Sequence, residues 1–224
     1  MRPIPAPLDP GAGYVSQAPS RYQFLRSDVA VALLGALRQT RTRFRRDPLA
    51  IGDASQWDGG RPASDLGTTR HISHLGGRDV DVALASDDPE APSLFVRHCQ
   101  GVRTELDVFQ CAPGTVHGFD ALRMAYFLGL LVDGPTPNGI HMPEGRPGPI
   151  AEVETIYTDQ AYIDEVGRAA QVLRERRWIH DDGYAALGED GIMRPSPWHT
   201  DHVHVRFGGE AARAPLTPAP GSSP

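Results

Sequence analysis

The sequence predicts an α+β fold, in which a small and mostly antiparallel sheet is flanked by helices and by long Gly/Pro-rich loops. Segments typical of helices and of strands both occur, but they lack the strict alternation that a parallel α/β sheet requires. Glycine (24 residues) and proline (21 residues) make up about a fifth of the 224 residues, which favours long irregular connections. A chain of this length can bury one sizeable core, so a single main domain is expected.

Three segments have the pattern of helices. Ser27 is placed to cap a helix that runs to about Phe44, and apolar residues recur along one side of that helix. Residues 119–132 are apolar nearly all round, as in a buried helix. Asp159 is placed to cap a third helix, along which four apolar residues recur at helical spacing: Ile163, Val166, Ala170 and Leu173.

Four segments have the pattern of strands: residues 49–52, 79–84, 153–157 and 201–207. The second segment reads D-V-D-V-A-L, and this alternation of polar and apolar residues is typical of a half-buried strand. These strands are expected to form the sheet of the fold.

The ends of the chain differ in composition from its middle. Residues 1–20 are rich in proline and glycine and are expected to form an extended entry segment, and residues 209–224 have the composition of a disordered tail. Residues 21–208 are therefore expected to form the folded domain. Within it, residues 53–77 and 134–149 are long loops, and the second is long enough to border a binding site.

Composition excludes several classes of function. The net charge of −6 includes no basic stripe, which argues against a nucleic-acid partner. No run of about 18 apolar residues occurs, so no membrane-spanning helix is expected. All 22 basic residues are arginine, which rules out a Schiff-base lysine and a phosphate-loop lysine. The N-terminus lacks the apolar segment of a secretion signal, and the sequence does not indicate an oligomeric state.

The two cysteines, Cys99 and Cys111, are too few for a zinc ribbon or a disulfide scaffold. In an oxidising compartment they are able to close one loop, but their spacing alone does not decide whether they do so.

Five of the nine histidines fall in two short windows, with His71 and His74 in the first, and His199, His202 and His204 in the second. The other four are isolated and are interpreted as structural or solvated: His98, His117, His141 and His180. Residues 180–182 read His-Asp-Asp, and a solvated loop is the favoured interpretation there.

A metal site explains the two windows better than surface histidines do. Asp81 follows His74 by seven residues, with a Gly-Gly pair between them that allows the chain to turn. On a strand, residues two apart share a face, so His202 and His204 project together, as do Asp79 and Asp81. Imidazole and carboxylate are ordinary zinc ligands, and a catalytic zinc takes three protein ligands. A surface pair of histidines is the alternative interpretation.

Five segments in this order resemble a known family. They are Tyr22–Asp28 (Y-Q-F-L-R-S-D), Ile51–Asp53 (I-G-D), Gly59–Arg61 (G-G-R), His71–Asp81 (H-I-S-H-L-G-G-R-D-V-D) and His199–Arg206 (H-T-D-H-V-H-V-R). Together they are similar to the penicillin-insensitive murein endopeptidases, of the lysostaphin, D-Ala-D-Ala carboxypeptidase and Hedgehog superfamily of zinc peptidases. The similarity covers roughly residues 21–207. Signatures of other hydrolases, such as H-E-x-x-H and G-x-S-x-G, are missing.

The resemblance implies that His74, Asp81 and His204 bind one zinc ion, and that the sheet carries these ligands. It implies that His202, with His199 beside it, is the general base or transition-state donor. His71 and Arg61 are expected to support a zinc ligand or to face the substrate.

The chemistry that the resemblance implies is hydrolysis, by a zinc-activated water, of a peptidoglycan cross-link of the D-Ala–meso-diaminopimelate type. Peptidoglycan is thus the expected partner, and a periplasmic or extracellular location follows from that substrate. Two alternatives stay open: a D,D-carboxypeptidase or dipeptidase acting on stem peptides, and a zinc-bearing cell-wall binding module without turnover.

Overall fold

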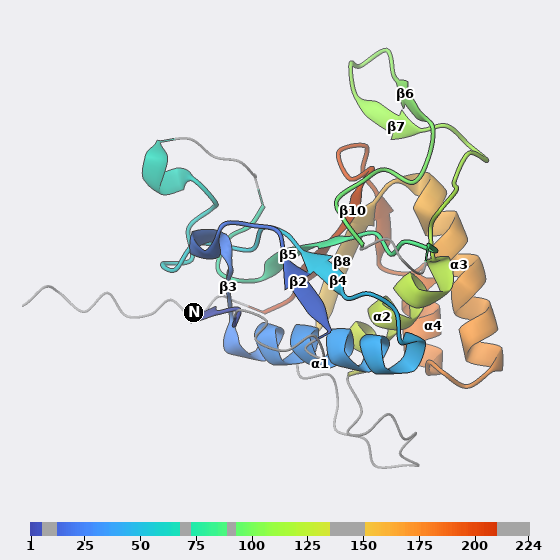
Figure 1. Cartoon of the computed structure of the whole chain (residues 1–224), viewed down its shortest axis with the longest axis horizontal. Coiled ribbons are helices and arrows are strands. Elements are labelled where there is room, and N and C mark those ends of the chain that lie inside the picture. Colours follow the sequence, from blue (N-terminus) through green and yellow to red (C-terminus); the bar gives the residue numbers. More distant parts are fainter. Residues whose placement is uncertain (6–12, 68–72, 89–92, 135–150, 210–224) are drawn as a thin grey trace, which may run out of the picture.

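A six-stranded sheet forms the centre of the computed structural model, which describes residues 1–5, 13–67, 73–88, 93–134 and 151–209. Across the sheet the strands follow the order β2 (Tyr14–Ser16), β4 (Leu49–Ile51), β5 (Asp79–Ala83), β10 (His202–Phe207), β8 (Val153–Thr158) and β9 (Met193–Pro195) (Figure 1). The three inner pairs are antiparallel and the two outermost pairs are parallel. The expected α+β fold with a mostly antiparallel sheet is thereby confirmed.

Four α-helices accompany this sheet in the described residues: α1 (Ser27–Phe44), α2 (Ala121–Asp133), α3 (Gln160–Glu175) and α4 (Asp181–Leu187). Asp159 caps α3, as predicted, because its side chain accepts a hydrogen bond from the Ala161 amide at 3.0 Å. The predicted cap of α1 is wrong. Ser27 is the first residue of that helix, and Arg26, which precedes it, makes no side-chain capping bond.

The solvated loop expected at residues 180–182 is also wrong, because α4 begins at Asp181. The buried carboxylate of Asp133, the last residue of α2, anchors this helix. It accepts hydrogen bonds from the amides of His180 (2.8 Å) and Gly183 (2.9 Å). The polar segment His-Asp-Asp therefore leads into a helix, because the buried Asp133 carboxylate satisfies amide groups at its start.

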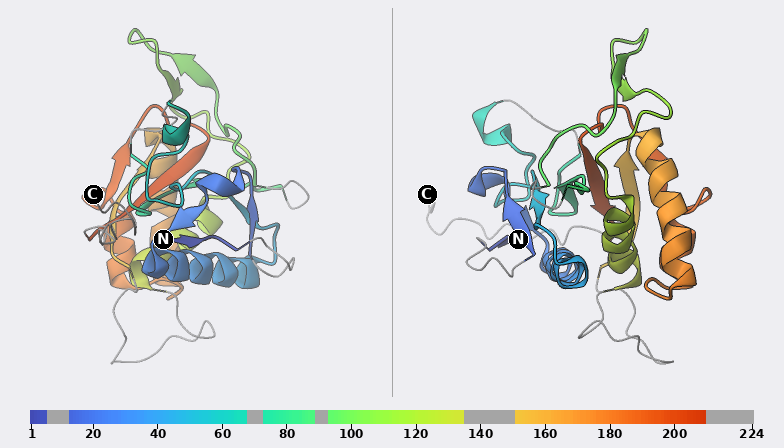
Figure 2. Two further views of the ribbon diagram at one scale, coloured as in Figure 1. Left: turned by 90° about the vertical axis from the view of Figure 1, so that its left-hand side faces the viewer. Right: turned by 45° about the vertical axis from the view of Figure 1, so that its right-hand side comes forward.

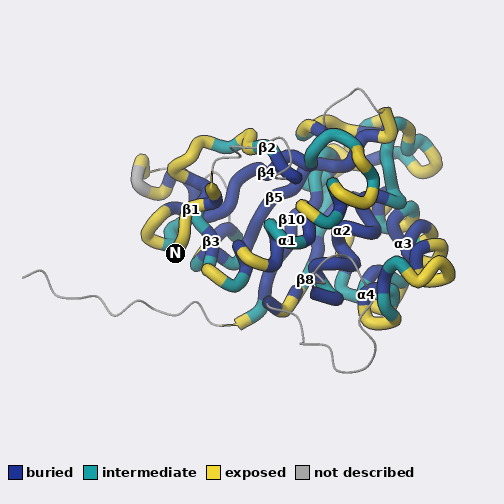
Figure 3. The backbone as a smooth tube through the Cα atoms, turned by 60° about the horizontal axis from the view of Figure 1, so that its bottom comes forward, coloured by how far each residue is buried: buried dark blue, intermediate teal, exposed yellow. Residues whose placement is uncertain are grey.

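The two faces of the sheet have different roles. Val80 and Val82 of β5 and Val203 and Val205 of β10 belong to the hydrophobic core that the sheet shares with the helices. All five residues of β5 are nevertheless buried, so the expected half-buried strand is wrong (Figure 3). Its polar face, with Asp79 and Asp81, contributes to the site described below and is shielded from solvent.

A second, two-stranded sheet projects from the body as a hairpin of β6 (Gly101–Arg103) and β7 (Phe109–Cys111) (Figure 1). A disulfide between Cys99 and Cys111 closes its base, which settles the pairing that the sequence leaves open. The short strands β1 (Arg2–Pro3) and β3 (Phe24–Leu25) form a third sheet.

None of the described helices is both long enough and apolar enough to cross a membrane. The predicted loop at residues 134–149 and the predicted tail at 209–224 lie almost entirely outside the described residues.

Candidate metal centre

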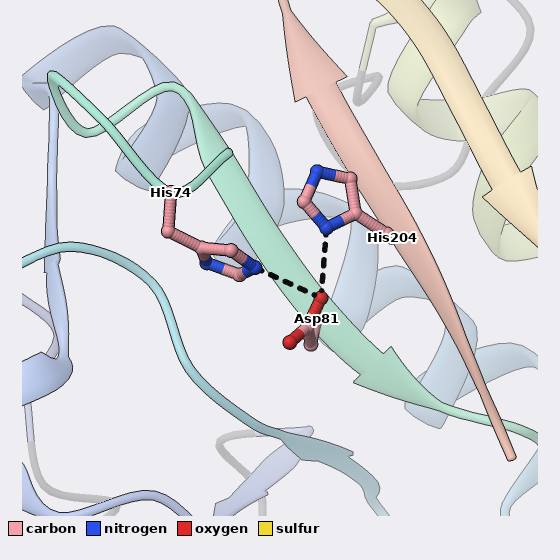
Figure 4. A group of neighbouring side chains, drawn as sticks. All are labelled: His74, Asp81 and His204. Carbon is pink, nitrogen blue, oxygen red and sulfur yellow. Dashed lines mark hydrogen bonds and ion pairs between the residues drawn. The ribbon is translucent and has the colours of Figure 1, made fainter. Parts of the chain in front are cut away.

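The pairing of β5 with β10 brings the two halves of the site together. In this antiparallel register, Asp81 lies directly opposite His204, and Asp79 lies opposite Arg206. Directly opposed side chains on one face of a sheet lie close enough to interact. Figure 4 shows the imidazole of His204 and the carboxylate of Asp81 meeting across the two strands, with His74 approaching from the loop that precedes β5.

Two glycines allow that loop to place His74. Gly76 and Gly77 adopt left-handed backbone conformations, with φ of 71° and 67°, which glycine reaches without strain. A Cβ atom on Gly77 would lie 2.5 Å from the backbone nitrogen of Arg26. The Gly-Gly pair therefore acts as expected from the sequence, because it turns the chain between His74 and Asp81.

Three buried side chains form a group that can hold a metal ion: His74, Asp81 and His204. Their ligand atoms lie within 4.8 Å of one another. From Oδ1 of Asp81, Nε2 of His74 is 3.3 Å away and Nδ1 of His204 is 3.0 Å away. No more than 3% of any of these residues is exposed. Two imidazole nitrogens and one carboxylate oxygen suit a divalent transition metal and leave room for a further ligand.

The remaining nitrogen of each ring is held by a neighbour. Nδ1 of His74 lies 2.9 Å from the Ala54 carbonyl oxygen, and Nε2 of His204 lies 2.9 Å from Oδ1 of Asp79. If these nitrogens carry the protons, Nε2 of His74 and Nδ1 of His204 are left with lone pairs directed at Asp81. Such outer hydrogen bonds orient histidine ligands in metal sites. The group therefore fits a metal ion in its donor set and in its surroundings.

Charge interactions within the group set its protonation when no metal is bound. Burial alone would raise the pKa of Asp81, but interactions with His74 and His204 outweigh burial and hold the pKa well below its usual range. Burial alone would lower the pKa of His204, but hydrogen bonds to Asp79 and Asp81 outweigh it and raise the pKa to about 9. At neutral pH the metal-free site thus contains an imidazolium between two carboxylates.

His202 lies beside this group and is paired with an acid of its own. Its Nδ1 is 2.6 Å from Oδ1 of Asp201, and its Nε2 is 3.6 Å from Oδ1 of Asp81. Burial would raise the pKa of Asp201, but the hydrogen bond with His202 outweighs burial and lowers it. The Phe95 ring packs beside His202, with 5.7 Å between the ring centroids. Asp201 and His202 therefore form a carboxylate–imidazole pair directed at the metal group.

His199 lies next to His202, with 4.8 Å between the two ring centroids. Its Nδ1 is 2.6 Å from Oγ of Ser196, and its carbonyl oxygen accepts a hydrogen bond from the Asp159 amide at 3.1 Å. Burial, followed by the neighbouring His202 and His204, lowers the pKa of His199 to about 3. This ring is therefore neutral at neutral pH.

The structure brings together five of the seven residues predicted for the site: His74, Asp81, His199, His202 and His204. His71 lies outside the described residues. Arg61 is half-buried in the loop after β4, and its carbonyl oxygen accepts a hydrogen bond from Gln56 at 2.5 Å. Within the described part of the chain, Arg61 makes no hydrogen bond or ion pair with the histidines or with Asp81.

Sequence reasoning missed the partners of the histidines. Asp79 was recognisable, because it shares a strand face with Asp81. Asp201 gave a weaker signal, since neighbouring residues in a chain rarely point the same way. The Ala54 carbonyl gave none, because a backbone acceptor carries no sequence signature.

Comparison with models of known protein families finds no match to this chain. A search of curated proteins finds no match either.

Proposed function

We propose that the chain is a zinc metallopeptidase that hydrolyses peptidoglycan stem-peptide cross-links of the D-Ala–meso-diaminopimelate type. One observation carries the proposal: a buried His74–Asp81–His204 group has the His202–Asp201 pair at its edge, with 3.6 Å between His202 and Asp81. The motif resemblance in the sequence supports the substrate. A periplasmic or extracellular location follows from that substrate.

The donor set favours zinc. Two histidines and one carboxylate form a common three-ligand set for catalytic zinc, whereas calcium and magnesium prefer oxygen ligands. A zinc ion bound by these residues would polarise the scissile carbonyl and lower the pKa of a water molecule. The single group among the described residues corresponds to one zinc ion per chain.

His202 is placed to move the proton. With Nδ1–H donated to Asp201, its Nε2 is free to accept a proton in the space beside the metal group. The Asp201 carboxylate holds the ring in this tautomer and stabilises the imidazolium that forms. His202 can then deliver the proton to the leaving amine.

His199 has a different role, because its low pKa keeps it neutral throughout the reaction. A neutral imidazole beside a cationic His202 adds no charge repulsion and can donate a hydrogen bond to the substrate. Ser196 and the backbone of Asp159 hold the ring in place.

A digest of purified cross-linked peptidoglycan, with and without a chelator, tests the proposal when the muropeptides are identified by mass spectrometry. We expect chelator-sensitive conversion of dimers to monomers without loss of terminal D-Ala. Release of D-Ala or of a dipeptide from monomers would instead indicate a D,D-carboxypeptidase or dipeptidase. Unchanged muropeptides with zinc still bound would indicate a binding module.

Asp201→Asn provides a sharper test of mechanism. The variant keeps a hydrogen-bond partner for His202 but removes the charge that favours its imidazolium, so turnover should fall by about 10² or more while zinc content stays constant. Turnover equal to that of the wild type would contradict the role of His202.

A further inference from the structure

A cavity of about 440 Å³ opens between the β6–β7 hairpin, the first turns of α3 and the 195–197 segment. This volume is in the range of small-molecule binding pockets. Figure 2 shows the hairpin rising beside the end of α3 from which the helix starts. Val102 and Gln110 of the hairpin line one wall, and the disulfide at Cys111 fixes the base of that wall.

The cavity shares a residue with the candidate catalytic site. Ser196 lines the cavity, and its Oγ is 2.6 Å from Nδ1 of His199. The His199 ring in turn contacts that of His202. A substrate whose scissile bond lies beside His202 can therefore extend a neighbouring side chain past Ser196 into the cavity.

The charged groups in the cavity are predominantly acidic. Asp164 and Glu165 contribute carboxylates, and Arg168 contributes the only guanidinium among the lining residues. Glu165 pairs with Arg168 at 2.6 Å, and Asp164 accepts a hydrogen bond from Gln160 at 2.7 Å. Asp159 also lines the cavity, but its two oxygens accept backbone amides and are already used. Glu165 and Arg168 balance each other, so the excess of negative charge at the cavity comes from Asp164, which is exposed on α3.

We propose that this cavity binds the ammonium group on a side chain of the stem peptide, adjacent to the bond that is cleaved. The inference rests on the proposed function. In the donor stem peptide, the diaminopimelate that precedes the cleaved D-Ala carries a free ammonium and a carboxylate at the end of its side chain, whereas the side-chain amine of the acceptor diaminopimelate is the nitrogen of the cleaved amide. Asp164 would accept a charge-assisted hydrogen bond from the ammonium. The Glu165–Arg168 pair would open, so that Glu165 also accepts from the ammonium and Arg168 pairs with the carboxylate. An apolar wall at Val102 would contact the methylene groups of that side chain.

Binding of two probes to the zinc-loaded protein tests the inference without requiring turnover. The first is the N-acetylated tripeptide L-Ala–D-Glu–meso-diaminopimelate with its side-chain amine free, and the second has that amine acetylated. By calorimetry we expect the wild type to bind the acetylated probe at least about tenfold more weakly, because acetylation removes the charge. The double variant Asp164→Asn/Glu165→Gln should lose a similar factor for the free-amine probe and little for the acetylated one.

Glu175→Gln is the matched control, since it removes one carboxylate from an exposed position near the other end of α3. It should leave binding of both probes unchanged. Three results would each overturn the inference. The wild type binds the two probes equally, it binds neither, or Glu175→Gln weakens binding of the free-amine probe as much as the double variant does.

Hydrolysis of cross-linked dimers, measured in parallel, separates the two proposals. Hydrolysis without amine-dependent binding overturns only the role of the cavity. The opposite result is amine-dependent binding that is lost in Asp164→Asn/Glu165→Gln, without any hydrolysis. It would support ammonium binding in the cavity and overturn the proposed peptidase activity.

Discussion

Zinc and a proton compete for His204, and this competition predicts a steep pH dependence of metal affinity. The imidazole is 2% exposed and lies between Asp79 at 2.9 Å and Asp81 at 3.0 Å, contacts that raise its pKa to about 9. A metal ion needs the lone pair that this proton occupies, so binding must release the proton. Well below pH 9 the neutral fraction of His204 falls about tenfold for each pH unit.

The magnitude follows from that pKa. Between pH 9 and pH 7 the zinc affinity of the wild type should fall about 50-fold, or about 2.3 kcal/mol of binding free energy. Competition with a chromophoric chelator at several pH values measures this slope. Calorimetry in two buffers of different ionisation enthalpy should show about one proton released per zinc at pH 7.

Asp79→Asn identifies the source of the effect. Without the charge of Asp79, the pKa of His204 should fall towards its usual value. As the pH rises, the zinc affinity of the variant should therefore reach its plateau at a lower pH than that of the wild type. At about pH 10, where the proton competes little in either protein, the variant should bind zinc about 10–100-fold more weakly than the wild type because the ring is less well oriented.

Asp201→Asn is the matched control, because it makes the same chemical change beside a histidine that is not a ligand. Its zinc affinity should follow the wild-type curve at every pH. The reasoning is refuted if wild-type affinity is the same at pH 7 and pH 9, or if Asp201→Asn reproduces the effect of Asp79→Asn.

Three further predictions concern the frame around the site. Gly52→Ala places a Cβ 2.5 Å from the ring of Phe95, which packs beside His202, so cross-link hydrolysis should slow about tenfold or more. In a Phe95→Ala background, the same change should have little added effect on hydrolysis. Tyr162→Phe removes a buried hydroxyl that accepts a hydrogen bond from the His98 amide at 2.8 Å and donates one to the Thr200 carbonyl at 3.1 Å. Urea denaturation should show a free energy of unfolding about 1–3 kcal/mol lower than that of the wild type, and an equal value would contradict this. Replacing Cys99 and Cys111 by serine opens a loop between residues 12 apart and should cost about 2–3 kcal/mol in the same assay, with zinc stoichiometry unchanged.

The strong local patterns in the sequence predicted the central elements of the fold. The D-V-D-V alternation located β5, and the run of apolar residues at 119–132 located α2 within two residues. Elements fixed mainly by distant contacts were missed. The start of α4 depends on the buried Asp133, nearly 50 residues earlier in the chain, and the three-residue strands β6, β7 and β9 are too short to show a period.

For the site, spacing predicted which side chains come together but not what surrounds them. His74, Asp81 and His204 could be predicted because strand geometry and two glycines relate their positions. The burial of β5 on both faces could not be predicted, because side chains from distant parts of the sequence, such as His204, pack against its polar face. The cavity at α3 also depends on the position of the hairpin relative to the helix, which no local pattern encodes.

The most direct test of the central claim is a paired measurement on His202→Ala, with zinc stoichiometry and cross-link hydrolysis determined on the same preparation. His202 is assigned to proton transfer and not to metal binding, so we predict one zinc per chain, as in the wild type, and no detectable hydrolysis. Loss of zinc from this variant would contradict the assignment of His74, Asp81 and His204 as the complete ligand set, and full activity would contradict the role of His202.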